Sequence, residues 1–317
     1  MMNLPLIYYP STLCWVDDDA LFLEIATERF KSEFNIKTAF SPKEAVSFFE
    51  NYEPTINPLT LFRSCFDHEE YDLADHHPVD ISFDAIRNIK NNQKKISDIA
   101  VIIIDYVMPG MSGIELCHAL KDIPAKKILL TGNADYEETI RAFNQGIIHC
   151  FIRKDDSDIG TALSSNILRL NTEYFMEQTA SILSHIQSAH PLPQSDPVFI
   201  EFFNAMAEKL NIKEYYLADK NGSMILINAN GSVNHLMIHS DRTLNSFVEL
   251  HKNTSDAPLF IQLIEEKNKL PFFPLGKEAW EIDINAWPDY FHAHNTLKGR
   301  EDYYWILIPQ NGDNNDQ

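Results

Sequence analysis

The chain of 317 residues lacks any apolar run as long as the roughly 18 residues that a membrane-spanning helix needs. Its first ten residues also lack the basic start and long apolar core of a secretory signal. We therefore expect a cytoplasmic protein without a membrane segment. The composition, 44% hydrophobic and 23% charged, is that of a folded globular protein, and the length favours two domains.

Cysteine is scarce, and none of the cysteines forms a CxxC pair. Metal-binding and redox sites in cytoplasmic proteins usually need such pairs, and disulfides are rare in a reducing compartment. We therefore expect the four cysteines to be small core residues: Cys14, Cys65, Cys117 and Cys150.

An excess of basic charge is also missing. The chain has 26 basic and 46 acidic residues, a net charge of −20, and the parts before and after residue 189 are both acidic. Binding to a phosphate backbone requires clustered lysine and arginine, and the second half shows no basic helix-turn-helix pattern. These absences argue against DNA as a partner.

The first half alternates short apolar runs with amphipathic stretches, which is typical of a parallel sheet covered by helices. The run at residues 99–104 is apolar throughout, as in a strand buried on both faces. The predicted strands are 12–16, 36–40, 99–104, 127–130 and 150–152, and the predicted helices include 42–50, 114–120 and 136–145.

Residues 51–95 interrupt this alternation with a segment rich in Asp, His, Asn and Pro, in which we predict one short helix at 83–89. Loops of this length inside a compact domain are usually functional or disordered. Its clustered histidines and carboxylates suggest either a metal site or, the interpretation we favour, a solvated loop that docks a partner such as a kinase. The residues concerned are His68, Glu69, Glu70, His76 and His77.

A long helix is predicted after residue 158, because apolar residues recur there at spacings of four, three and four. This spacing resembles the seam of a coiled coil. Three prolines within residues 190–197 then mark a linker. We therefore predict a first domain at 10–160 with its insertion at about 51–95, a linker helix at 161–189, and an α+β output domain at 195–310.

Polar residues follow four of the predicted strands. Asp17 and Asp18 follow the first, Asp105 the third and Thr131 the fourth, and Lys154 follows the fifth. Carboxyl ends of parallel strands meet at one edge, where open α/β sheets bind ligands. Like charges about 4 Å apart repel by on the order of 4 kcal/mol at an effective dielectric near 20. Mg²⁺ prefers carboxylate oxygens, so the sequence predicts a Mg²⁺ site at this edge.

These segments resemble, in order, the CheY-like receiver domain of two-component systems. They read CWVDDD at 14–19, IIIDYVMPGMSG at 102–113, LLTGN at 129–133 and FIRK at 151–154. The resemblance implies a doubly wound, flavodoxin-like (βα)5 domain, here with a long insertion between its second helix and third strand.

The resemblance also implies the roles of the acidic residues. Asp105 would accept a phosphoryl group from phospho-histidine on a histidine kinase or phosphotransfer protein. Asp18 and Asp105 would ligate Mg²⁺ directly together with the Val107 carbonyl, and Asp17 would act largely through water. The apolar Val107 replaces a polar side chain that in some relatives positions hydrolytic water, so we expect slow loss of the phosphoryl group.

Three further residues receive roles from the same resemblance. Lys154 would neutralise charge on the transferring group, and Thr131 would hydrogen-bond the new phosphoryl oxygen. Phe151 matches the aromatic switch that turns inward when the loop after Thr131 moves. Asp155 stands where the family usually has proline, which leaves the geometry of that loop undetermined.

The second half carries no P-loop, no HExxH and no motif of the cyclic-dinucleotide enzymes. Its pattern predicts a helix, a hairpin turning at Lys220-Asn221-Gly222, two helices and three strands. That order resembles a PAS-type sensor fold, with an unrelated α+β interaction domain as the alternative. The predicted helices are 198–210, 244–252 and 259–266, and the strands are 215–218, 224–227, 280–284, 290–294 and 303–308.

Together these patterns predict a response regulator whose phosphorylation controls an output other than DNA binding. We expect no enzyme activity beyond phosphorylation and dephosphorylation of the receiver itself. A homodimer is expected through helix 158–187, or through the face formed by helix 136–145, strand 150–152 and the helix that follows. Two other classes stay open: a divergent C-terminal hydrolase of nucleotides or phosphoproteins, and a phosphate-sink or adaptor protein.

Overall fold

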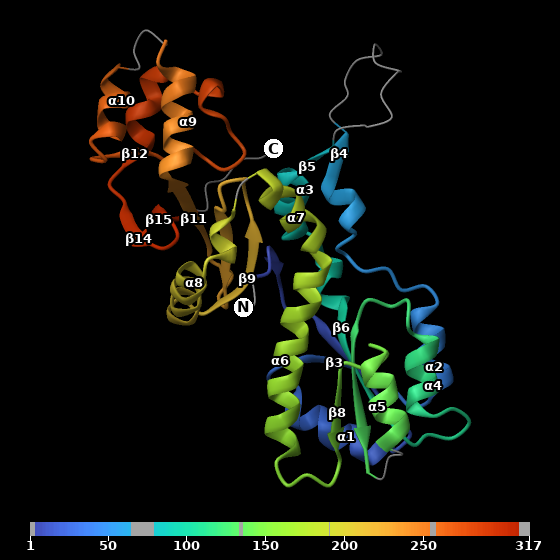
Figure 1. Ribbon diagram of the computed structural model, residues 1–317. Coiled ribbons are helices and arrows are strands. Elements are labelled where there is room, and N and C mark those ends of the chain that lie inside the picture. The colour runs from blue at the N-terminus through green and yellow to red at the C-terminus, as the bar shows by residue number, and fades with distance from the viewer. Residues whose placement is uncertain (1–3, 65–78, 133–135, 190, 254–257, 311–317) are drawn as a thin grey trace, which may run out of the picture. The chain divides into compact units, whose positions relative to one another are not determined.

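The computed structural model describes residues 4–64, 79–132, 136–189, 191–253 and 258–310 (Figure 1). The chain forms two compact units, and each is assembled from separate stretches of sequence. The parallel-sheet unit comprises residues 9–57 and 91–178, and the antiparallel-sheet unit comprises residues 1–8, 58–90 and 179–317. In the part of the chain that the structure describes, we find no helix with the length and apolar character that a membrane crossing requires.

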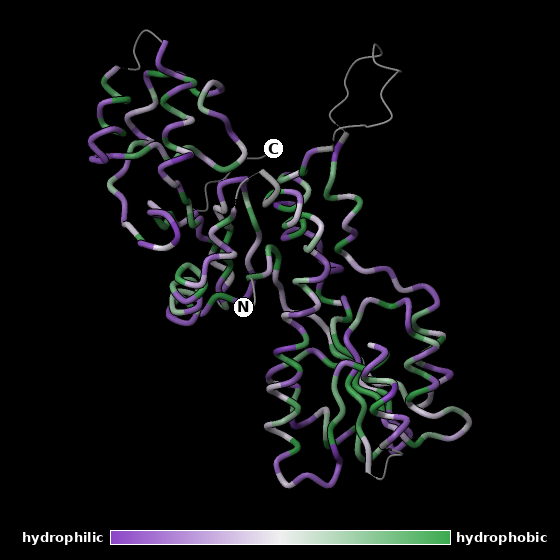
Figure 2. The backbone as a smooth tube through the Cα atoms, viewed as in Figure 1, coloured by the Kyte–Doolittle hydropathy of each residue, from purple (hydrophilic) through white to green (hydrophobic). Residues whose placement is uncertain are grey.

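The parallel-sheet unit has five strands in the order β3-β2-β6-β7-β8, and every neighbouring pair is parallel. All residues of β6 and β7 are buried, and Figure 2 shows the centre of this sheet as hydrophobic. This confirms the predicted flavodoxin-like α/β fold. The strands are β2 (Thr12–Val16), β3 (Asn35–Ala39), β6 (Ile99–Asp105), β7 (Lys126–Thr131) and β8 (Cys150–Arg153).

Five helices cover this sheet, with α6 on one face and α2, α4 and α5 on the other (Figure 1). Local capping sets where two of them begin. Ser41 accepts a hydrogen bond from the Glu44 amide, and Ser112 forms a reciprocal capping box with Glu115. The helices are α1 (Ala20–Phe30), α2 (Pro42–Phe49), α4 (Gly113–Ala119), α5 (Tyr136–Asn144) and α6 (Ile159–Gln178).

The apolar stripe of α6 corrects one prediction. Leu163, Ile167, Leu170 and Tyr174 are all buried, and α6 packs against β6, β7 and β8 of its own unit. The stripe is therefore not the exposed seam of a coiled coil, because the same spacing also suits a helix that covers a sheet. The helix ends at Gln178, and a separate helix, α7 (Ala180–Ala189), follows in the other unit.

His149 lies beside β7 and makes a pH-dependent contribution to the stability of this unit. Its Nδ1 accepts a hydrogen bond of 3.1 Å from the Lys127 amide. Burial, with the neighbouring charges of Lys126 and Lys127, lowers the pKa of His149 from 6.5 to about 4. The folded state therefore keeps the ring neutral, whereas the unfolded chain takes up a proton below pH 6.5.

We expect His149 to reduce the free energy of unfolding by up to about 2–3 kcal/mol as the pH falls from 6.5 to 4. His149→Asn keeps an acceptor for the Lys127 amide but does not titrate. The difference in unfolding free energy between wild type and this variant, measured by urea denaturation, should therefore shrink across that window. A difference that is constant with pH would contradict the assignment.

The antiparallel-sheet unit has six strands in the order β1-β9-β10-β11-β15-β14. Alternate residues of its central strands pack into two different cores. For example, Tyr303 lies in the core that contains Phe199, whereas Tyr304 lies in the core that contains Trp287. The strands are β1 (Ile7–Tyr8), β9 (Ile212–Leu217), β10 (Met224–Asn228), β11 (Val233–Ser240), β14 (Asn295–Lys298) and β15 (Asp302–Pro309).

Helices α8 (Pro197–Lys209), α9 (Asp241–His251) and α10 (Pro258–Glu265) contribute to these two cores. Two short pairs of strands complete the unit. They are β4 (Phe62–Ser64) with β5 (Val79–Ile81), and β12 (Leu270–Pro271) with β13 (Phe291–His292). This half is therefore an antiparallel α+β domain.

Part of the segment at 51–95 belongs to the antiparallel-sheet unit. The predicted short helix is confirmed as α3 (Phe83–Ile89), which packs against β9 of that unit. Arg87 donates a hydrogen bond of 2.6 Å from Nη1 to the Ala218 carbonyl. The histidines and carboxylates of the suggested metal site, residues 68–77, lie outside the described residues, as does Cys65.

The hairpin prediction in the second half is correct, because β9 and β10 pair across the turn at residues 218–223. Asp219 accepts hydrogen bonds from the Asn221 and Ser223 amides, and Gly222 has a φ of +93° that suits glycine.

The predicted order of two strands, helices and three strands is wrong. A third strand, β11, precedes the helices, because β10 turns back directly into it. Most of residues 280–294 form 3₁₀ helices, η4 (Ala279–Glu281) and η5 (Ile284–Tyr290), where Asp283 caps the first turn and Pro288 lacks the amide of a strand residue.

Two of the three cysteines in the described residues lie in the core, as predicted, and the third is half-buried. Cys14 and Cys117 are buried free thiols, and Cys150 is half-buried. Burial raises the pKa of both buried thiols to about 12, so they are unreactive at neutral pH.

Candidate functional site

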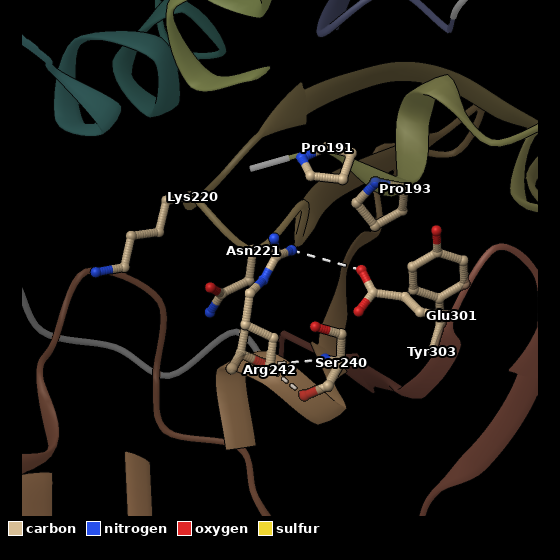
Figure 3. Close-up of a pocket in the computed structure, with 9 residues that line it drawn as sticks. Pro191, Pro193, Lys220, Asn221, Ser240, Arg242, Glu301 and Tyr303 are labelled. Atoms are coloured by element: carbon tan, nitrogen blue, oxygen red, sulfur yellow. Dashed lines mark hydrogen bonds and ion pairs between the residues drawn. The ribbon is translucent and has the colours of Figure 1, made fainter. Parts of the chain in front are cut away.

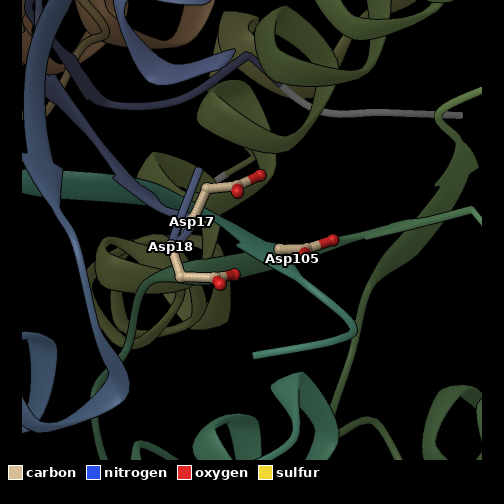
Figure 4. A group of neighbouring side chains, drawn as sticks. All are labelled: Asp17, Asp18 and Asp105. Atoms are coloured by element: carbon tan, nitrogen blue, oxygen red, sulfur yellow. The ribbon is translucent and has the colours of Figure 1, made fainter. Parts of the chain in front are cut away.

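The carboxyl ends of β2 and β6 bring three aspartates together. The two strands are paired in parallel up to Val16 and Ile104, so Asp17, Asp18 and Asp105 follow at the same edge. One carboxylate oxygen from each of them lies within 4.8 Å of the others. Figure 4 shows the three side chains pointing into the same region beyond the strand ends. The predicted cluster is therefore formed.

Lys154 joins this cluster from the loop after β8. Its Nζ lies 2.7 Å from Asp17 Oδ2 and 2.9 Å from Asp105 Oδ1. Burial raises the pKa of Asp105, although the contact with Lys154 opposes this rise. Burial alone would lower the pKa of Lys154, but its bonds to Asp17 and Asp105 raise it. One ammonium thus faces three carboxylates, which leaves an excess of negative charge at the edge.

Thr131 ends β7 next to Lys154, and its carbonyl accepts a hydrogen bond of 2.8 Å from the Lys154 amide. Its side-chain hydroxyl is buried and has no hydrogen-bond partner among the described residues. Burying a hydroxyl without a hydrogen-bond partner costs free energy, and a functional role such as ligand binding is one explanation for such a group. A Cβ built on the neighbouring Gly132 would meet no atom of the described residues within 4 Å.

Gly113 holds the backbone of Asp105 in place. Its amide donates a hydrogen bond of 2.8 Å to the Tyr106 carbonyl, at the start of α4. A Cβ at this position would lie 2.2 Å from the Asp105 carbonyl oxygen and 2.9 Å from Leu129 Cδ1. Only glycine permits this approach, and α4 therefore packs directly under the acceptor strand.

Two residues near the cluster were not predicted from the sequence. The Phe22 ring lies under Lys154, with Nζ 4.5 Å from the ring centroid, in a cation–π contact. The Asp19 amide donates a hydrogen bond of 3.0 Å to Asp17 Oδ1, and the Asp19 carboxylate caps α1. Phe22 is half-buried, and nothing in the sequence indicates its contact with Lys154.

The other predicted site residues lie further out. The Val107 side chain is 65% exposed, and the Phe151 side chain is 37% exposed with its ring edge-on to Phe143. Asp155, which stands at the family's usual proline, pairs with Arg153 at 2.5 Å on the surface. The structure therefore brings Asp17, Asp18 and Asp105 together and pairs Lys154 with Asp17 and Asp105, whereas the Phe151 side chain is partly exposed.

Residues 58–163 match the family of response regulator receiver domains. No curated protein matches the chain. Among solved structures, the response regulator LqsR of Legionella pneumophila is 24% identical, with a TM-score of 0.76, and the match covers 98% of this chain and 91% of that one. This likeness shows a shared fold over nearly the whole chain.

Two other matches are confined to about half of the chain. An adenylate cyclase from Rhodopirellula baltica is 19% identical with a TM-score of 0.37, over 54% of this chain and 94% of that one. A CheY-like receiver domain protein from Methanospirillum hungatei JF-1 is 18% identical with a TM-score of 0.36, over 53% of this chain and 98% of that one.

The matched family segment contains Asp105, Thr131 and Lys154, and the sheet places Asp17 and Asp18 beside them. The chain therefore contains a response regulator receiver domain, with the acidic triad typical of a phosphoacceptor site.

Proposed function

We propose that the protein is a response regulator switched by Mg²⁺-dependent phosphorylation of Asp105. The observation that carries this proposal is the convergence of Asp17, Asp18 and Asp105 within 4.8 Å, with Lys154 bound to two of them. Asp105 is the last residue of a strand that is buried throughout, so the strand fixes the position from which its carboxylate can attack phosphorus.

In the proposed reaction, an Asp105 carboxylate oxygen attacks the phosphorus of a phospho-histidine on a kinase or phosphotransfer protein. A phosphorus–oxygen bond forms, the phosphorus–nitrogen bond breaks, and the departing imidazole takes up a proton from water. The Lys154 ammonium, already 2.9 Å from Asp105, is placed to stabilise negative charge on the transferred group.

The acidic cluster fits the Mg²⁺ that receiver domains use. Three carboxylates against one ammonium leave an excess of negative charge, and carboxylate oxygens are the ligands that Mg²⁺ prefers. Asp17, Asp18 and Asp105 would hold the ion, together with the Val107 carbonyl. When bound, Mg²⁺ neutralises charge on the phosphoryl oxygens.

Thr131 and Phe151 would report the new phosphoryl group to the rest of the molecule. The Thr131 hydroxyl lacks a partner among the described residues, and a phosphoryl oxygen on Asp105 would accept its hydrogen bond. We propose that this bond draws the loop after β7 inward and that Phe151, now partly exposed, turns in behind it. A phosphate adds about −1.5 to −2 charge to drive the change.

The proposal is tested by incubating the full chain with acetyl phosphate and Mg²⁺, then measuring its intact mass. We expect wild type to gain one phosphoryl group and Asp105→Asn to gain none. Asp122→Asn, on the surface of the same unit, is the matched control and should behave like wild type. Equal incorporation in Asp105→Asn and wild type would contradict the proposal.

The exposed Val107 side chain predicts slow loss of the phosphoryl group. Hydrolysis needs a water molecule aimed at phosphorus, and an apolar side chain cannot hydrogen-bond that water. We expect a lifetime of many minutes for wild type and a loss about tenfold faster for Val107→Asn. This acceleration is smaller than the roughly hundredfold or more that a positioned general base supplies, because Asn can orient the water but cannot take its proton. Decay of the phosphorylated mass with time measures both, and a wild-type lifetime of seconds would count against this role.

We propose protein–protein or small-ligand binding, controlled by phosphorylation, as the output of the antiparallel-sheet unit. The net charge of −20 supports partners other than DNA. The order of elements behind the PAS likeness differs from the structure, so the proposal does not include a sensor of that type. Apart from phosphoryl transfer at the receiver, we propose no catalytic activity, and turnover of a nucleotide or phosphoprotein would contradict that part.

A further inference from the structure

The start of α9 forms a small hollow in the antiparallel-sheet unit, far in sequence from the receiver residues. Ser240, Arg242, Lys220 and Asn221 line it together with Glu301, and two prolines and the Tyr303 ring form its apolar wall. Figure 3 shows the Arg242 and Glu301 side chains facing each other across it.

Ser240 presents an unused hydroxyl to this hollow. The residue is 5% exposed, and its Oγ has no hydrogen-bond partner in the described part of the chain. Thr243 satisfies the Ser240 backbone instead, since Thr243 Oγ1 accepts from the Ser240 amide at 2.9 Å and donates to its carbonyl at 3.0 Å. The Ser240 hydroxyl occupies the N-cap position of α9 in a capping-box arrangement with Thr243 but makes no side-chain hydrogen bond there. It points toward the space between Arg242 and Glu301 (Figure 3).

The rest of the lining favours negative charge. The first amide groups of a helix have no acceptor within it, and the helix dipole adds a partial positive charge there. Arg242 Nε is buried and lacks a hydrogen-bond partner among the described residues, and the ion pair of Arg242 with Glu301 is long at 3.5 Å. Lys220 also borders the hollow, but its side chain points away from Ser240 and Arg242 (Figure 3).

The nearby carboxylates are already engaged elsewhere. Asp241 accepts hydrogen bonds from Lys267 and Tyr304, and Asp219 accepts from the Asn221 and Ser223 amides. Glu301 is thus the carboxylate in the lining that an anion would meet, and it faces Arg242.

We infer that this hollow is a binding site for an oxyanion, the phosphate or carboxylate group of a small ligand. The Ser240 hydroxyl, the Arg242 guanidinium and the first amides of α9 would donate to it. Such a ligand would give the antiparallel-sheet unit an input of its own, separate from phosphorylation of Asp105.

The test is calorimetric titration of the full-length Asp105→Asn chain with inorganic phosphate in Mg²⁺-free buffer, with chloride at the same ionic strength as reference. Position 105 cannot be phosphorylated in that background, so the result does not depend on the proposed phosphorylation, and the Arg242 and Ser240 variants show whether phosphate binds at the hollow. We expect saturable binding, weakened about tenfold or more by Arg242→Gln, because a charge-assisted bond is lost. Lys252→Gln removes one positive charge near the other end of α9, and should bind phosphate like the parent.

The Ser240→Ala variant tests whether the Ser240 hydroxyl binds a ligand or only stabilises the fold. Because its hydroxyl has no partner, we expect an unchanged or slightly raised melting temperature without phosphate, and several-fold weaker phosphate binding. Repeating the titration with acetate then distinguishes phosphate from carboxylate ligands, and binding of either supports the site. No saturable binding of either ion would overturn the inference. Binding that is equal in the parent, Arg242→Gln and Ser240→Ala would also overturn it.

Discussion

Replacing Leu6 with alanine is expected to lower the free energy of unfolding of the antiparallel-sheet unit by about 2–5 kcal/mol. Leu6 and Ile7 are completely buried, although they lie some 200 residues before β9 in sequence. The Leu6 carbonyl accepts a hydrogen bond of 2.7 Å from the Leu217 amide, and β1 pairs with β9 through Ile7 and Tyr216. Residues 6–8 are therefore an integral part of the sheet of this unit.

Urea denaturation followed by tryptophan fluorescence measures this effect. In a Trp15→Phe background the remaining tryptophans, Trp280, Trp287 and Trp305, all lie in the antiparallel-sheet unit. Leu250→Ala, in α9 of the same unit, is the matched control, because that side chain is 73% exposed and should cost no more than about 0.5 kcal/mol. If Leu6→Ala cost no more than this control, the assignment of β1 to the sheet would be wrong.

Replacing Gly113 with alanine is expected to destabilise the parallel-sheet unit by about 3 kcal/mol and to reduce phosphorylation of Asp105. The added Cβ would lie 2.2 Å from the Asp105 carbonyl oxygen, so either α4 or the end of β6 must move. Movement of β6 would displace the acceptor from Lys154, which contacts it at 2.9 Å. The free energy of unfolding and the phosphorylation of Asp105 should therefore decrease together.

Gly132→Ala is the matched control for this substitution, since its Cβ would meet none of the described residues within 4 Å and its backbone is not in the left-handed region. We expect its free energy of unfolding to change by less than about 0.5 kcal/mol. Urea denaturation compares the two variants, monitored by fluorescence of the buried Trp15 in a background in which Trp280, Trp287 and Trp305 are replaced by phenylalanine. A Gly113→Ala protein as stable as Gly132→Ala would show that the close approach of α4 to Asp105 is not required.

The parallel sheet and its site could be predicted because their signals are local. Each strand is an apolar run, and the acidic, hydroxyl and lysine residues follow directly at the strand ends, where the sheet topology brings them together. The cluster of Asp17, Asp18 and Asp105 with Lys154 follows from that rule alone. The contact of Phe22 with Lys154 does not, because it depends on how α1 is rotated.

The antiparallel-sheet unit was predicted less well because its partners are distant in sequence. Nothing local to Leu6 indicates pairing with Leu217, and nothing local to α3 indicates packing on β9. The apolar stripe of α6 was ambiguous for another reason, since a helix on a sheet and a helix in a coiled coil share nearly the same spacing. The aromatic run around Trp287 fills a core through 3₁₀ turns, where its composition had indicated strands.

The central claim is that Asp105 itself carries the phosphoryl group. The direct measurement is to phosphorylate wild type with acetyl phosphate and Mg²⁺, reduce the acyl phosphate with borohydride, and sequence the peptides by mass spectrometry. Reduction converts a phosphorylated aspartate into homoserine. We predict homoserine at position 105, with Asp17 and Asp18 unchanged. Homoserine at position 17 or 18 instead, or none at position 105, would contradict the account.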